Sequence, residues 1–192
     1  MENLKAKNIE SIQSSITMII LLISFSMLFG TLFMGYMVYR VRATVWPPMG
    51  MNDLSLLYPS ISTAVISLSS LAYYLFEIQV KNKNISSARF YLQASLMLGL
   101  GFCGSQFMVW NDLALRGITQ GSGIFGSMIY GFTWIHVAHV VIGIFLLFWI
   151  AFKVKSIRVI EHKNQLRVKS VGMFWHFLGL VWFIMYLILF IF

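Results

Sequence analysis

Five long stretches of this chain contain no Asp, Glu, Lys or Arg, and they constrain the fold more than any other feature of the sequence. They cover residues 11–39, 54–76, 90–111, 117–152 and 170–192, which are 29, 23, 22, 36 and 23 residues long. About 20 apolar residues in a helix cross a bilayer core of about 30 Å. Each stretch is therefore long enough for one crossing, and the fourth is too short for two crossings joined by a turn.

Lipid offers no hydrogen-bond partner to a polypeptide backbone, so each crossing should be helical. We predict an all-α membrane protein, a bundle of five transmembrane helices with spans at approximately 14–38, 58–80, 90–111, 125–152 and 171–191. The connections between them are short, so residues 1–192 are expected to form a single transmembrane domain. The first apolar run is longer than the core of a cleaved signal peptide, about 7–15 residues, and is predicted to be a span.

The basic residues are distributed unevenly between the two sides of this predicted bundle. The net charge is +8, and 11 of the 14 Lys and Arg residues fall in the N-terminal tail and in the second and fourth connections. Basic residues favour the cytoplasmic side of a membrane. The N-terminus is therefore predicted to be cytoplasmic and the C-terminus outside. A nucleic-acid surface would need these charges on one folded domain, which the sequence lacks.

A few polar side chains lie within the predicted spans, where such residues are costly and are candidates for function. Three are histidines and one is an amide: His136, His139, His176 and Gln106. A zinc site would need further ligands, and no Cys or carboxylate is near the histidines in the sequence. Haem would need two axial histidines from facing helices, for which His139 and His176 are candidates. A proton relay would need carboxylates, and no span has one in its middle.

Hydrogen bonds between packed helices, or contacts with lipid headgroups, are the favoured roles for these polar side chains. Small residues in the first three spans would allow helices to pack closely. Trp175, Trp182 and Tyr186 are expected to fix the last helix. The residues thus assign no catalytic group, no cofactor-binding group and no metal site to this chain.

Two segments that contain the histidines resemble motifs of subunit III of the haem-copper oxidases. Residues 133–143, T-W-I-H-V-A-H-V-V-I-G, resemble the family motif T-G-F-H-G-L-H-V-x-x-G, and Gly126-Ser127 precede them at the family's spacing. Residues 175–186, W-H-F-L-G-L-V-W-F-I-M-Y, resemble W-H-F-x-D-x-V-W-x-x-x-Y. The two motifs with their spacing are specific together.

Weaker similarities occur in the same order elsewhere in the chain. Trp46-Pro47-Pro48 is similar to the W-P-P of the first connection in short bacterial members, and Gln106 with Trp110 fits a Q-x-x-E-W pattern. Ser24 with residues 27–30 resembles S-E-x-M-L-F-G. The resemblance covers most of the chain, and short members of the family have five helices with the C-terminus outside.

Three carboxylates that are familiar in this family are missing here. The first-helix Glu is replaced by Phe25, the third-helix Glu by Val109 and the fifth-helix Asp by Gly179. In the family these carboxylates are linked to hydrogen bonding and to proton delivery near the catalytic subunit. That role does not carry over to apolar residues.

The resemblance implies an accessory, non-catalytic subunit of a terminal oxidase in a bacterial inner membrane. Haem and copper would lie in the partner subunits I and II, and phospholipid would be held in a cleft between the first two helices and the rest. The accessory subunit would stabilise the catalytic subunit during turnover. A subunit-III-like protein of a nitric oxide reductase, a stand-alone small transporter and a membrane cytochrome b stay open as alternatives.

Overall fold

The computed structural model describes residues 2–44, 55–156 and 162–191, and these residues form five α-helices and one short π-helix. The elements are α1 Glu2–Arg42, α2 Leu57–Lys81, α3 Ile85–Leu115, α4 Ile124–Ser156, α5 His162–Tyr186 and the π-helix η1 Leu187–Ile191. Helices α1 to α4 each contain a segment long and apolar enough to cross a membrane, and the fifth such segment runs from α5 into η1. The prediction of an all-α chain with five such helices is confirmed, and the chain is a multi-pass membrane protein. Its orientation stays a prediction.

Helices α1 to α4 extend beyond the predicted spans at both ends, and α5 begins before its predicted span. Four predicted spans lie inside α1 to α4, and the fifth, 171–191, runs from α5 into η1. The Trp46-Pro47-Pro48 motif lies outside the described residues.

Hydroxyl groups on α1 satisfy their hydrogen-bonding needs within their own helix. Thr17, Ser24, Ser26 and Thr31 donate to backbone carbonyls three or four residues earlier, at 2.8–3.0 Å. This local bond lets a hydroxyl face lipid without an unpaired donor. These residues therefore do not mark a polar path along α1.

A glycine-dependent turn ends α3 and sets the start of the following segment. Gly117 has a φ of 78°, a left-handed conformation that favours glycine. Its N–H donates to Ala114 O at 3.0 Å, and Ile118 N–H donates to Leu113 O at 2.9 Å. This Schellman arrangement buries Ile118 under the end of the bundle.

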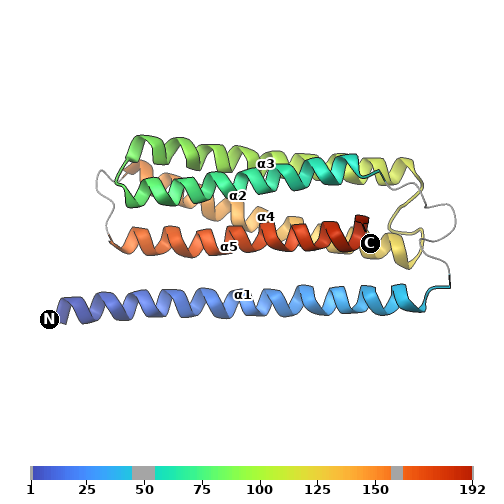
Figure 1. The fold of residues 1–192 in the computed structure, drawn as a ribbon, viewed down its shortest axis with the longest axis horizontal. Helices are drawn as coiled ribbons and strands as arrows, with labels where there is room; N and C mark the ends of the chain where they lie inside the picture. Colours follow the sequence, from blue (N-terminus) through green and yellow to red (C-terminus); the bar gives the residue numbers. More distant parts are fainter. Residues whose placement is uncertain (1, 45–54, 157–161, 192) are drawn as a thin grey trace.

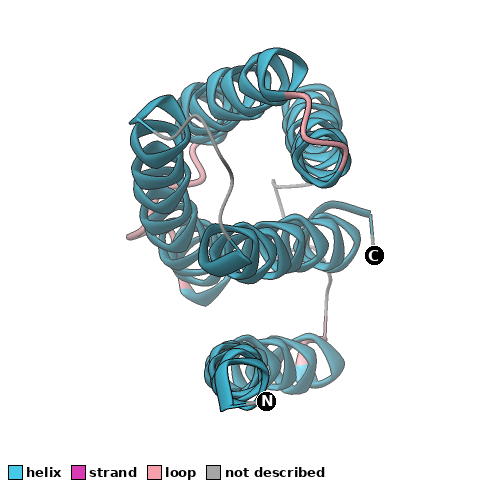
Figure 2. Cartoon of the chain, turned by 90° about the vertical axis from the view of Figure 1, so that its left-hand side faces the viewer, coloured by secondary structure: helices cyan, strands magenta, loops and turns pink. Residues whose placement is uncertain are grey.

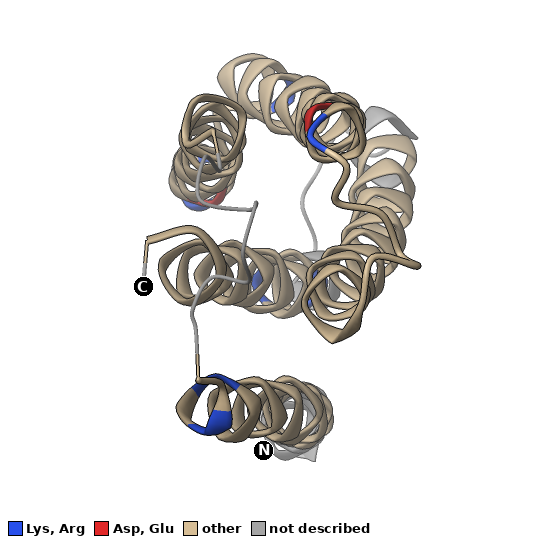
Figure 3. Cartoon of the chain, turned by 90° about the vertical axis from the view of Figure 1, so that its right-hand side faces the viewer, with Lys and Arg blue, Asp and Glu red and all other residues tan. Residues whose placement is uncertain are grey.

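Helices α2 to α5 form a bundle, and α1 runs beside it (Figures 1 and 2). Within the bundle α2 packs against α3 and α5, and α4 packs against the same two helices. The end of α2 and the start of α5 lie at the same end of the bundle as the start of α1 (Figure 1). The ends of α1 and α3 lie at the opposite end, where Arg116 forms an ion pair with Asp112 at 2.9 Å (Figure 3).

Helix α1 contacts the bundle through aromatic rings on one side. Phe25 and Phe29 lie against His139, with ring centroids 4.6 and 5.7 Å apart, and Phe33 stacks on Phe132 at 5.7 Å. The resemblance implies a lipid cleft between the first two helices and the rest. In the structure α2 packs against α3 and α5 within the bundle, and α1 lies beside the bundle against α5 (Figure 2).

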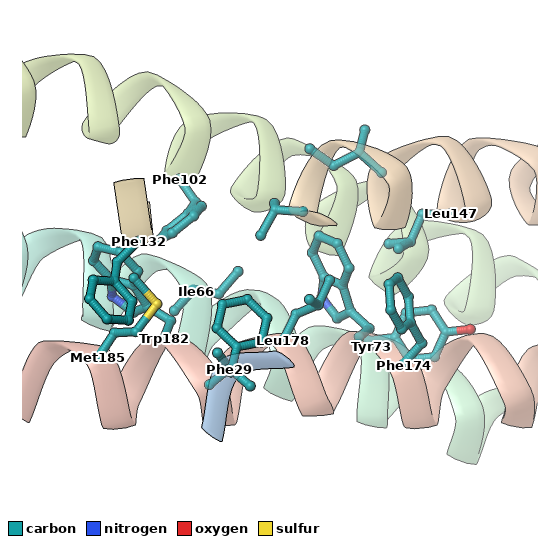
Figure 4. Close-up of a cluster of buried hydrophobic side chains, with 14 of the residues drawn as sticks. Phe29, Ile66, Tyr73, Phe102, Phe132, Leu147, Phe174, Leu178, Trp182 and Met185 are labelled. Carbon is teal, nitrogen blue, oxygen red and sulfur yellow. The ribbon is translucent and has the colours of Figure 1, made fainter. Parts of the chain in front are cut away.

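The bundle core is filled by large buried side chains (Figure 4). Trp175 and Trp182 on α5 are both almost fully buried. Gly99 on α3 and Gly143 on α4 lie against the ring of Trp175, close enough that a Cβ on either would be within 2.9 Å of a ring atom. The two glycines therefore allow a tryptophan to fit where three helices meet.

Candidate functional site

A line of hydrogen bonds joins α5 to α2, and we refer to it as the α2–α5 seam. Four polar side chains on α5 each meet a hydroxyl on α2. The pairs are Tyr186 Oη with Ser60 Oγ at 2.7 Å, Trp182 Nε1 with Thr63 Oγ1 at 3.0 Å, His176 Nδ1 with Ser70 Oγ at 2.6 Å and Trp175 Nε1 with Ser69 Oγ at 3.3 Å. Hydrogen bonds between transmembrane helices are worth about 0.6 kcal/mol each on average. The seam holds α5 in one register on α2.

The seam continues towards the end of α2. Tyr73 on α2 is fully buried and donates from its hydroxyl to Val168 O on α5 at 2.9 Å. One turn further along α2, the carboxyl of Glu77 lies against Gly172 on α5, where a Cβ would collide with Glu77 Oε1. Glycine at this position therefore lets a carboxylate lie directly on the surface of α5.

A second set of hydroxyls joins α2 to α3. Ser62 Oγ lies 2.7 Å from Ser105 Oγ, and both residues are buried. Ser69 and Ser95 are bonded reciprocally: each hydroxyl donates to the other residue's carbonyl, at 2.7 and 3.0 Å. These small side chains let α2 and α3 approach closely while their polar atoms stay paired.

Two aromatic side chains form further hydrogen bonds between α4 and the end of α3. Trp110 donates from Nε1 to Thr133 Oγ1 at 3.0 Å. Tyr130 donates its hydroxyl to Trp110 O and Ile118 O, both at 3.1 Å. The bonds fix one end of α4 against the last turns of α3.

Gln106 and His136 lie deep in the bundle without hydrogen-bond partners. Both side chains are fully buried, and none of their four nitrogen and oxygen atoms has a partner among the described residues. The ring of His136 is surrounded by Phe29, Phe102 and Trp182, with centroids 5.5–6.1 Å away. A buried polar group left unsatisfied costs about 1–3 kcal/mol, so this pair is the least favourable part of the core.

His139 and His176 are in different surroundings from His136. His139 is half-buried, and its Nδ1 lies 2.6 Å from Ile135 O in its own helix. His176 belongs to the α2–α5 seam, with its ring edge-on to Tyr73 at 6.0 Å. His139 therefore faces α1, His136 faces the centre of the bundle and His176 faces α2. The three side chains do not converge on one point.

Within the described ranges, no three His, Cys, Asp or Glu side chains are grouped as metal ligands would be. The arrangement is one of helix-to-helix contacts rather than of a nucleophile beside a base.

We next compared the chain with known protein families. A family model described as cytochrome c oxidase subunit III matches residues 4–192, which is nearly the whole chain. The chain belongs to the cytochrome c oxidase subunit III family. The family inferred from the two histidine motifs is confirmed.

Similar subunit III proteins come from bacteria with different oxidases. Cytochrome c oxidase subunit 3 of Thermostichus vulcanus is 28% identical over 174 residues, which cover 91% of this chain and 85% of the relative. The same subunit of Synechocystis sp. is 23% identical over 90% of this chain and 73% of its own length. Cytochrome bo(3) ubiquinol oxidase subunit 3 of Pseudomonas aeruginosa is 26% identical over 85% of this chain and 78% of its own length.

The three positions where subunit III motifs have carboxylates are packed against other parts of this chain. Phe25 lies between His139 and Phe174, at 4.6 and 5.8 Å between ring centroids. Val109 is buried in the core. Gly179 faces α2, where an added Cβ would lie 3.9 Å from Ser70 Cβ.

Sequence reasoning did not predict the hydrogen bonds between α2 and α5. Ser60, Ser69 and Ser70 were expected only as small residues that let helices pack closely, and Thr63, Tyr73 and the contact of Glu77 with Gly172 were not predicted. A signal was present, because adjacent hydroxyl residues recur seven positions apart at 62–63 and 69–70. A seven-residue repeat places side chains on one side of a helix after two turns.

Proposed function

We propose that this chain is the accessory subunit III of a terminal haem-copper oxidase in a bacterial cell membrane. It would contain no redox centre, and haem and copper would lie in the catalytic subunit I and in subunit II. The match of residues 4–192 to the subunit III family carries the proposal. The relatives belong to cytochrome c oxidases and to a ubiquinol oxidase, so the family match does not distinguish cytochrome c from quinol as the electron donor. The experiment below distinguishes them.

The outer face of α1 is suited to contact with a partner helix or lipid. Ile20, Met27, Met34 and Val41 are spaced seven residues apart, and between 60% and 83% of each is exposed. Such a spacing forms a nearly straight apolar stripe along a helix. We assign this stripe to contact with the catalytic subunit, and the aromatic contacts of α1 on its other side connect that contact to the bundle.

A groove between α1 and α4 is suited to a lipid chain. Its volume is about 390 Å³, and its lining includes Leu32 and Gly35 from α1 with Met128, Gly131 and Phe132 from α4. The two glycines leave open space, since an added Cβ at either has no neighbour within 4 Å. An acyl chain in this groove would fill the space that separates α1 from the bundle.

The orientation proposed for the subunit follows from the distribution of basic residues. The N-terminal tail and the connections after α2 and α4 contain 11 of the 14 Lys and Arg residues. Basic residues near the ends of spans favour the cytoplasmic side, so this end would face the cytoplasm.

The decisive experiment is affinity purification of the tagged chain from its native membrane in mild detergent. The partners would be identified, a visible spectrum recorded and oxygen consumption measured with reduced cytochrome c and with quinol as donors. A haem-bearing subunit, a copper-binding subunit and oxygen consumption support the proposal and reveal the donor. A nitric-oxide-reducing partner, or a colourless chain without partners, contradicts it.

A variant of the α1 stripe tests the contact surface in the same preparation. Replacing Met27 and Met34 with tryptophan should reduce recovery of the catalytic subunit. The same change at Phe90 and Phe107, which are exposed on α3, is the matched control. Equal recovery from both variants would place the catalytic subunit elsewhere on the bundle.

A further inference from the structure

A pocket of about 260 Å³ lies where α2 ends and α5 begins, away from the groove beside α1. Its polar lining consists of Glu77 and Lys81 from α2 with Gln165 and Lys169 from α5, and Val80 and Val168 contribute apolar surface. The two helices that form it are held together by the α2–α5 seam. The seam therefore fixes the positions of the α2 and α5 side chains of the pocket relative to one another.

Its charged groups are close together and do not neutralise one another through direct contacts. The Glu77 carboxyl lies against Gly172 and within electrostatic range of Lys81 and Lys169. None of these three charged side chains forms an ion pair or hydrogen bond with another described residue. Both lysines are exposed, so their ammonium groups are accessible to a ligand. With two ammonium groups and one carboxylate, the lining has one net positive charge.

The pocket lies at the charged end of two candidate membrane-crossing helices, where lipid headgroups are expected to meet the hydrocarbon core. Lys81 is the last residue of the apolar segment Leu57–Lys81, and Gln165 and Lys169 lie in the first turns of α5. Lysines at such a boundary are attracted to anionic lipid headgroups. A ligand that enters from the membrane would therefore present its headgroup at this depth.

We propose that this pocket binds the headgroup of an anionic phospholipid that has a single negative charge. Lys81 and Lys169 would hold the phosphodiester, and Gln165 would supply a further hydrogen bond. Glu77 would accept from a hydroxyl of the headgroup, as in phosphatidylglycerol, and would disfavour a ligand with a second negative charge. The volume of the pocket suits a headgroup, so the acyl chains would lie outside it.

The first test is native mass spectrometry of the purified complex titrated with phosphatidylglycerol and with phosphatidylcholine. Phosphatidylglycerol should bind more tightly, and Lys81→Ala/Lys169→Ala should weaken it about 30-fold, as expected for two lysines at a membrane surface. The control is Lys83→Ala/Arg89→Ala, which removes two exposed basic residues near the same end but outside the pocket. Equal losses in the two variants, or equal binding of the two lipids, overturn the proposal.

Two further binding measurements distinguish phosphatidylglycerol from phosphatidic acid and from inorganic phosphate. Glu77→Gln should raise the affinity for phosphatidic acid, whose phosphate monoester has the higher charge, more than for phosphatidylglycerol. An unchanged ratio of the two affinities contradicts the role assigned to Glu77. Displacement of phosphatidylglycerol by millimolar inorganic phosphate would identify a site for a soluble anion and overturn the lipid assignment.

This inference does not depend on the identity of the oxidase. Recovery of the catalytic subunit is measured in the same preparations. A double variant that assembles normally and loses the lipid supports the pocket whatever the electron donor. A chain that binds the lipid without any oxidase partner supports the pocket and contradicts the proposed function.

Discussion

The indole ring of Trp175 on α5 fills the space that Gly143 leaves on α4: a Cβ at Gly143 would lie 2.8 Å from Cζ3 of the ring. Gly99 on α3 meets the same ring from another side, with 2.9 Å to Cη2. The ring is bonded through Nε1 to Ser69 Oγ on α2 at 3.3 Å. One side chain therefore contacts α2, α3 and α4.

Gly143→Ala should destabilise the subunit by about 1–3 kcal/mol, because overpacking forces the ring of Trp175 to move. The thermal unfolding midpoint of the purified complex measures the effect. Gly104→Ala is the control, since an added Cβ there has no neighbour within 4 Å. Trp175→Phe should relieve part of the loss in the Gly143→Ala background, and additive losses would contradict the contact.

Gln106→Met should leave stability unchanged or raise it by about 1–3 kcal/mol, because it removes an unpaired buried amide. Ser69→Ala is the contrasting variant: its hydroxyl is bonded to Ser95 and Trp175, so its loss should destabilise by about 1 kcal/mol. Denaturant unfolding of the chain measures both. A loss in Gln106→Met equal to that in Ser69→Ala would mean that the amide has a partner in the membrane.

Tyr186→Phe and Ser60→Ala should each cost about 0.6 kcal/mol, and the double variant should cost little more than either one. Their hydroxyl oxygens are 2.7 Å apart, so a double-mutant cycle isolates the bond between them. Unfolding free energies of the four proteins provide the coupling energy. Strict additivity would exclude a bond between the two hydroxyls.

Phe25→Ala should lower the stability of the complex by about 2 kcal/mol and leave the initial rate of oxygen consumption unchanged. The ring packs on His139 and Phe174, and its position has no ionisable group that could transfer a proton. Val109→Ala should behave in the same way, because Val109 is buried in the core. An immediate drop in turnover at unchanged assembly would refute this separation.

Gly131→Leu should reduce the lipid that co-purifies with the complex, because the new side chain would project into the groove between α1 and α4. Gly30→Leu is the control on α1, since Gly30 also has open space around it and is not part of the groove lining. Mass spectrometry of extracted lipids compares the two variants. Equal lipid content would show that the groove is not occupied by a lipid.

The sequence was sufficient to predict the five helices and the family, because bilayer thickness limits the length of an uncharged segment. The motif around His136 and His139 identified subunit III despite the missing carboxylates. The position of α1 could not be predicted in this way. Hydropathy measures how apolar a segment is and does not show which side of it, such as the side with Phe25 and Phe29, faces another helix.

The hydrogen-bonded pairs were also beyond a single sequence. Small residues such as Ser62 and Ser105 indicated close packing, but the pairing of a given hydroxyl depends on helix register and rotation. The unpaired atoms of Gln106 and His136 were equally unpredictable, since a polar residue in a span is ordinarily expected to find a partner. The pocket at Lys81 and Lys169 joins residues 88 positions apart, which only the packing of α2 on α5 brings together.

The paired hydroxyls of α2 determine its register on both neighbouring helices. Ser62 and Ser69 bond α3, whereas Thr63 and Ser70 bond α5, so both neighbours are joined at positions seven residues apart. A slide of α2 by one turn, about 5.4 Å, would break all four contacts together. The next register that pairs hydroxyls with the same neighbours is about 10.5 Å away, and a slide that far would either draw Lys81 into the hydrocarbon or lift apolar residues into water. Small displacements of α2 along its axis are therefore opposed by both neighbours, and the position of Lys81 relative to α5 is set by hydroxyls more than two turns away along the same helix.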